Sequence, residues 1–82
     1  MITDYLGVAM NQARYEKLSE NEGFYGEIPA CNGVFACGET LEQCREELAA
    51  VLEDWILFRI HQHLELPVIE GVQLKVVKEA AA

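Results

Sequence analysis

Five side chains in this sequence have the chemistry to bind a metal ion: Cys31, Cys37, Cys44, His61 and His63. The cysteines are six and seven positions apart, whereas structural zinc sites take paired ligands from much shorter spacings. The two histidines are two positions apart in a predicted helix, so their side chains point in roughly opposite directions. We therefore expect no metal and no cofactor, and interpret these residues as small buried or half-buried thiols, a helix-face cysteine and two histidines that end a helix.

The sequence also contains no recognisable complete set of catalytic residues. Cys37 precedes a helix start, where the pKa of a thiol can fall, but no general base is identifiable beside it. Glu16 and Glu27 lie on predicted strands, and nothing in the sequence brings them together around a metal. Gly33 and Gly38 lack the spacing and the lysine of a phosphate-binding loop. We expect that this protein is not an enzyme.

The composition indicates what the chain is suited to bind. Its 82 residues make one small domain, which has reason to oligomerise or to bind a partner because its own core is small. Fourteen acidic and six basic residues give a formal net charge of −8. This charge repels nucleic acid and attracts basic proteins in a salt-dependent way. A role in solubility alone is the alternative explanation.

Three features that the sequence lacks indicate where in the cell the protein is expected. The first residues lack the basic start and apolar run of a signal peptide. No segment reaches the roughly 18 apolar residues that span a bilayer. Three cysteines are an odd number, which argues against a secreted disulfide framework. We expect a cytoplasmic protein without a membrane partner.

The predicted elements are organised around a turn and a helix start. Gly38 permits a sharp turn, and Thr40 is placed to cap the helix that follows. Gln43 is placed to reach back to the Thr40 N–H, which would complete a capping box. We therefore predict a long helix from Leu41 to about His63, with Gly38, Thr40, Leu41 and Gln43 as its structural motif.

The remaining pattern predicts an α+β fold in the order α-β-β-β-α-β. A short amphipathic helix covers about residues 2–12. Alternating segments joined by turns predict an antiparallel meander over residues 13–19, 24–28 and 34–37. Pro67 should stop the long helix, and residues 72–77 alternate as a fourth strand. The whole of 1–82 is one domain, with a helical extension at about 2–12 and a core at about 13–78.

The long helix has more apolar surface than one sheet can cover. Its first apolar face should lie on the sheet; this face comprises Leu41, Cys44, Leu48, Val51, Leu52, Trp55 and Phe58. A second stripe in the latter half needs another cover, because a helix that is apolar nearly all round is buried nearly all round. The candidates are the N-terminal helix and another chain, so we also expect a homo-oligomer. The candidate interface residues are Ile56, Leu57, Ile60, Leu64, Tyr5 and Leu6.

The order of the elements and three short motifs resemble the HicB-like antitoxin domain. Gly23-Phe24-Tyr25 matches the aromatic residue that follows a hairpin glycine in that family. Pro29 and Gly33 match the outer residues of its Pro-Asp-Leu-Pro-Gly type loop. The run from Gly38 to Cys44 matches its helix-opening motif, with Glu39 in place of Asp. The resemblance covers residues 13 to about 58.

The resemblance implies a partial RNase H-like fold without the nuclease carboxylates. It also implies an antitoxin that binds and blocks a small basic RNA-cleaving toxin, HicA. Many family members add a DNA-binding domain, for which the fifteen residues after Pro67 are too few, so we expect no direct nucleic-acid binding. Two alternatives stay open: a self-associating domain with a small-ligand site between subunits, and a degenerate nuclease that uses Glu16.

Overall fold

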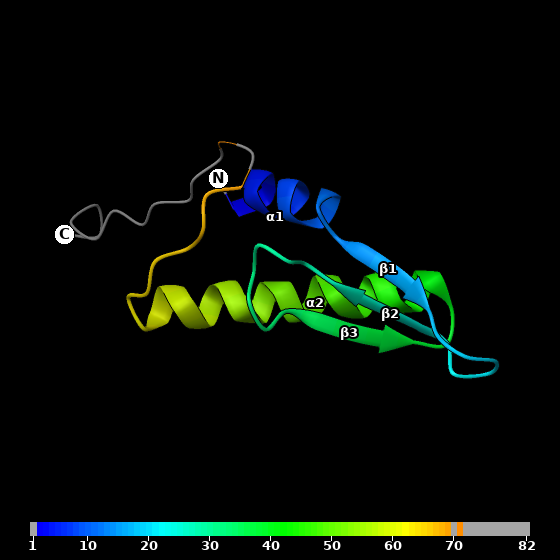
Figure 1. Ribbon diagram of the computed structural model, residues 1–82. Helices are drawn as coiled ribbons and strands as arrows, with labels where there is room; N and C mark the ends of the chain where they lie inside the picture. Colours follow the sequence, from blue (N-terminus) through cyan, green and yellow to red (C-terminus); the bar gives the residue numbers. More distant parts are fainter. Residues whose placement is uncertain (1, 70, 72–82) are drawn as a thin grey trace.

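Two helices lie on one side of a three-stranded sheet in the computed structural model of the chain, which describes residues 2–69 and 71, with side chains from Asp4 (Figure 1). The elements in chain order are α1 (Ile2–Asn11), β1 (Arg14–Lys17), β2 (Phe24–Glu27), β3 (Phe35–Gly38) and α2 (Leu41–His61). This is the predicted α+β arrangement of a helix, a meander and a long helix. The predicted fourth strand, 72–77, lies outside the described residues.

The strands pair in the order β1-β2-β3, and both pairs are antiparallel. Gly26 in the central strand is opposite Tyr15 on one side and Ala36 on the other. The turn between β1 and β2 closes with a hydrogen bond from the Leu18 N–H to the Gly23 carbonyl at 2.9 Å. Gly23 has a φ of 86° there, a conformation that favours glycine.

One face of this sheet is covered by α2. The position of Gly26 explains how the helix comes close: a Cβ there would be 2.9 Å from the Tyr15 ring and 3.1 Å from the Cys44 Sγ. The Cys44 thiol lies 3.5 Å from the Ala36 carbonyl oxygen, to which it donates a weak hydrogen bond. Small residues on the inner face of the sheet therefore let the start of α2 pack directly on the strands.

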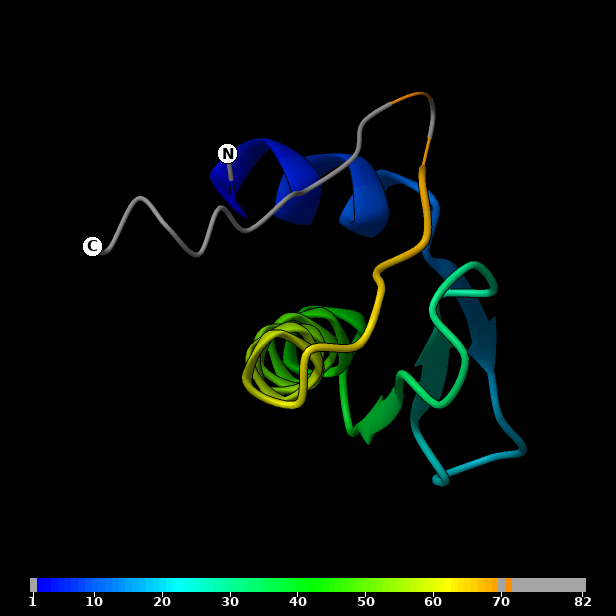
Figure 2. The same ribbon diagram turned by 90° about the vertical axis from the view of Figure 1, so that its left-hand side faces the viewer.

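The buried row of α2 turns from the sheet toward α1 as the helix proceeds. Its members are Cys44, Leu48, Leu52 and Ile56. Residues spaced by four advance by about 40° around a helix axis, so such a row winds around the helix. Seen end-on in Figure 2, the sheet and α1 lie on different sides of α2. The start of the row therefore faces the sheet, and the row turns toward α1 farther along the helix.

Because the buried row winds around α2, the predicted division of its apolar residues into a sheet-facing face and a separate second stripe is wrong. Ile56, assigned to the second stripe, is 1% exposed and belongs to the same core as Leu48 and Leu52. Phe58, predicted to lie on the sheet, is 58% exposed. The rest of the core comes from α1, from the loop before β3 and from the segment after α2; it comprises Tyr5, Ala9, Ile28, Cys31, Val34, Leu66 and Ile69.

The long helix ends earlier than Pro67 requires. Its last residue is His61, and His63 adopts a left-handed conformation with a φ of 60°. The His63 N–H donates to the Ile60 carbonyl at 3.1 Å, and the Leu64 N–H donates to the Arg59 carbonyl at 2.8 Å. This pair of hydrogen bonds is a Schellman motif. The helix is ended by its own C-terminal cap. Pro67 lies in the segment that follows and is not what stops the helix.

Replacing His63 with glycine should stabilise the protein by about 1 kcal/mol, because a side chain in the left-handed region strains the backbone and glycine does not. The matched control is His61→Gly, which places the same substitution inside the helix and should cost a few tenths of a kcal/mol or more. Urea denaturation of the three proteins measures the difference. Equal losses in both variants would contradict the expectation.

Candidate functional site

The predicted motif at the start of α2 is a structural one. The Thr40 Oγ1 accepts a hydrogen bond from the Gln43 N–H at 3.0 Å, so Thr40 is the N-cap. The Gln43 Oε1 accepts from the Glu39 N–H at 3.1 Å, one residue before the Thr40 N–H expected of a capping box. Leu41 is 47% exposed and contributes little to the core. These residues cap and position the start of α2.

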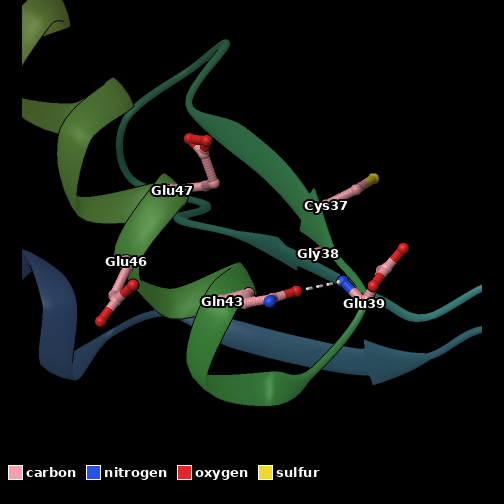
Figure 3. Close-up of a pocket in the computed structure, with 6 residues that line it drawn as sticks. All are labelled: Cys37, Gly38, Glu39, Gln43, Glu46 and Glu47. Carbon is pink, nitrogen blue, oxygen red and sulfur yellow. Dashed lines mark hydrogen bonds between the residues drawn. The ribbon is translucent and has the colours of Figure 1, made fainter.

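An open depression of about 510 Å³ lies beside this helix start. Its lining residues are Cys37, Gly38, Glu39, Gln43, Glu46 and Glu47. In Figure 3 the Cys37 thiol points away from the glutamates of α2, and the carboxylates of Glu46 and Glu47 point away from each other. The lining contains no lysine, arginine or histidine. The depression is acidic, but its side chains do not converge.

The residues considered for metal binding are spread over the molecule. Cys31 and Cys44 are buried, and burial raises the pKa of both thiols, so they are poor nucleophiles. Cys37 is exposed, as are His61 and His63 at the end of α2. Within the described part of the chain, no three His, Cys, Asp or Glu side chains are grouped to hold a metal ion.

Glu16 and Glu27 share the outer face of the sheet, which α2 does not cover. Glu16 is opposite Tyr25, and Glu27 is opposite Arg14, so the two carboxylates occupy diagonal positions. The Tyr25 hydroxyl donates to Glu27 Oε1 at 3.1 Å, and the Tyr25 ring stacks on Phe35 at a centroid distance of 6.2 Å. Desolvation, followed by the hydrogen bond to Glu27, raises the pKa of Tyr25.

The outward side of α2 combines acidic and apolar side chains. Its exposed side chains form two adjoining rows at helical spacing, which we call the outer strip of α2. One row comprises Glu42, Glu46, Glu53 and Leu57, and the other comprises Glu47, Asp54 and Phe58. Both rows are acidic from their start to residues 53 and 54, and apolar at their C-terminal ends, Leu57 and Phe58. Among the residues that the structure describes, none of these carboxylates is held in an ion pair.

The predicted interface residues fall into three groups. Tyr5 and Ile56 are buried, at 0% and 1% exposed. Leu6 and Ile60 are half-buried and pack against the core. Leu57 and Leu64 are 58% and 46% exposed, so they alone of the six offer a free apolar surface.

The most exposed aromatic residues among those that the structure describes were not predicted as surface groups: Phe58 in the outer strip of α2, and Phe35, 56% exposed, on the outer face of the sheet. For Phe58 a signal was present, since it is spaced by four and by eleven from Asp54 and Glu47 on one helical row. For Phe35 no such signal was present, because the alternation of β3 does not show which of its two faces is turned toward the helix.

Tyr5 holds α1 to the segment after α2, because its hydroxyl donates to the Pro67 carbonyl. Burial raises the pKa of Tyr5 to about 12, from an ordinary value of 10.0. A raised pKa favours the protonated hydroxyl in the folded state, so its contribution is complete below pH 10 and is lost as the pH rises toward 12. The loss should total roughly 2 kcal/mol.

Comparing the wild-type protein with Tyr5→Phe isolates this effect, since the other tyrosines titrate in both proteins. Below pH 10 the variant should be less stable by about 1 kcal/mol, the contribution of a hydrogen bond. The difference should shrink and then reverse as the pH approaches 12. A constant difference in denaturation midpoint from pH 8 to pH 12 would show that the Tyr5 hydroxyl does not titrate as stated.

The fold and its surfaces define a small α+β domain with an acidic helix face and no assembled catalytic group among the described residues. A family model described as UPF0150-like matches residues 4–67, and the chain belongs to this family. It is 40% identical over 60 residues to UPF0150 protein ssl0259 from Synechocystis sp., a match that covers 73% of this chain and 82% of that protein.

The fold also occurs in a solved structure. The crystal structure of TTHA0281 from Thermus thermophilus superposes with a TM-score of 0.88 and 41% sequence identity, covering 93% of this chain and 94% of that one. In the described residues of the present chain, neither helix has the length and apolar character needed to cross a membrane.

Proposed function

We propose that this UPF0150-like protein acts as a HicB-type antitoxin, a non-enzymatic protein that binds and blocks a small basic RNA-cleaving toxin. The resemblance of its hairpin and helix-opening motifs to the HicB-like domain supports the proposal. So does the order of the described elements, β-β-β-α after an N-terminal helix, which suits a partial RNase H-like fold. In the part of the chain that the structure describes, Glu16 and Glu27 belong to no group of three metal-ligating side chains, so the proposal assigns them no nuclease role.

The observation that carries the proposal is the unpaired acidity of α2. The chain has a formal net charge of −8, and the five carboxylates of the outer strip lie on one side of one helix. Charges of one sign gathered on one side attract a partner of the opposite sign and speed its association. A toxin that cleaves RNA is basic because it must bind phosphates. Carboxylates on the antitoxin therefore compete with RNA for the same basic surface.

Mixing the protein with a purified HicA-type toxin tests the proposal. We expect a complex at low salt that suppresses RNA cleavage in proportion to the amount of antitoxin added. Its affinity should fall roughly tenfold or more between about 0.05 M and about 0.5 M salt, because screening weakens attraction between exposed charges. The chain alone should cleave no RNA. Undetectable binding at low salt would end the antitoxin proposal.

The exposed Leu57 and Phe58 favour a second candidate, a self-associating domain with a small-ligand site between subunits. Sedimentation of the wild-type protein and of Leu57→Glu separates the two candidates. A dimer that the substitution dissolves would support self-association. Ile56→Glu and Ile60→Glu do not serve this purpose, because Ile56 lies in the core and Ile60 packs against it.

A further inference from the structure

We propose that the outer strip of α2 is the surface on which the basic partner docks, with its carboxylates facing lysines and arginines and with Leu57 and Phe58 facing apolar side chains. This inference rests on the proposed function, since it names the contact surface of that same interaction. It goes further by choosing one side of the molecule over the outer face of the sheet, which also bears an exposed phenylalanine.

The geometry of the strip supports a single continuous contact. Residues spaced by four and by seven lie on one side of a helix, so Glu46, Glu53 and Leu57 form a line, and Glu47, Asp54 and Phe58 form a second line beside it. From Glu42 to Phe58 the strip is about 24 Å long. That length matches the width of a small domain. A partner of the toxin's size can therefore contact the acidic and the apolar halves together.

The two halves of the strip have different roles in binding. Phe58 and Leu57 are each 58% exposed, and their burial would supply most of the affinity, because removing large apolar side chains from water is the main favourable term in most protein contacts. The carboxylates would mainly set the association rate and the choice of partner. Because they are free of ion pairs in the described structure, no internal contact has to break before they meet a basic partner.

A second copy of this chain fits the strip poorly. In a parallel pair the acidic halves of two α2 helices would face each other, and like charges repel. In an antiparallel pair the carboxylates of one copy would lie against Leu57 and Phe58 of the other, where they would lose water without gaining a counter-charge. A partner that is basic at one end of its contact surface and apolar at the other has neither defect. Charge complementarity therefore selects a basic protein as the occupant.

Two variants, each with a matched control, test this assignment against an immobilised HicA-type toxin at low salt. Phe58→Ser should weaken binding at least tenfold, whereas Phe35→Ser, which removes a ring of nearly the same exposure from the outer face of the sheet, should stay within about twofold. Glu46→Lys with Glu53→Lys should slow association at least tenfold. Glu16→Lys with Glu20→Lys changes the net charge equally but lies off the strip, so its effect should be much smaller.

The other outcomes distinguish a failure of the proposed function from a failure of the docking assignment alone. If the wild-type protein does not bind the toxin, the proposed function fails and the docking assignment fails with it. If it binds and Phe35→Ser weakens binding more than Phe58→Ser, the toxin docks on the sheet, so the inference is wrong while the proposed function stands. If the wild-type protein sediments as a dimer that Phe58→Ser dissolves, a second copy occupies the strip and the inference is equally wrong.

Discussion

An Ile56→Glu variant will fail to fold, whereas Leu57→Glu, one position further along the same helix, will fold with nearly wild-type stability. Ile56 is 1% exposed among the residues of the core, and Leu57 is 58% exposed. A carboxylate placed at position 56 would lose its water without gaining a partner. The cost should exceed about 4 kcal/mol, which is a large part of the stability of a domain of this size.

Circular dichroism and thermal denaturation of the two variants make this comparison. Both variants add one negative charge to the same turn of α2, so a general effect of charge would appear in both. If Ile56→Glu folded as well as Leu57→Glu, the assignment of Ile56 to the core would be wrong. The wound course of the buried row would then be wrong as well.

Gly38→Ala should cost about 3 kcal/mol, the second largest effect that we expect. A Cβ at position 38 would lie 2.4 Å from the backbone nitrogen of Cys44 and 2.8 Å from its Cα. These are backbone atoms in the first turns of α2, so they cannot rotate away as a side chain would. Either the helix moves off the sheet or the end of β3 shifts, and both break close packing.

Two other glycines provide the controls for Gly38→Ala. Gly33 has a φ of 93° but no atom within 4 Å of an added Cβ, so Gly33→Ala measures backbone strain alone and should cost about 1 kcal/mol. Gly7 lies within α1 with equally free space, and Gly7→Ala should stabilise the protein by about 1 kcal/mol. Denaturant titrations should show the largest loss of stability for Gly38→Ala, a smaller loss for Gly33→Ala and a gain for Gly7→Ala. A Gly38→Ala loss no larger than that of Gly33→Ala would contradict the close approach of the helix.

The elements of the fold could be predicted from the sequence because their signals are local. Alternation, turn glycines and the Thr40 cap each act within a few residues, and the structure has two helices and three paired strands where these signals lie. Element ends were less predictable. The end of α2 depends on the left-handed His63, for which the sequence carries no glycine.

The distribution of apolar side chains around α2 could not be predicted in the same way. Periodicity indicates that Ile56 and Phe58 lie on different faces, but which face is covered depends on where α1 and the segment after α2 return. Tyr5 and Pro67 meet across 62 positions of the chain. No local pattern specifies such a contact. The sequence therefore predicted an interface stripe through Ile56, whereas the surface exposed in the structure is the outer strip. Leu57 belongs to both.

The layered arrangement also means that the molecule has two independent sides. The helices lie on one face of the sheet, and the opposite face keeps the Tyr25–Phe35 stack and the Cys37 thiol at the surface. A toxin seated on α2 would leave that aromatic side unobstructed. The complex that we propose would therefore keep an exposed aromatic surface on the side opposite its basic partner.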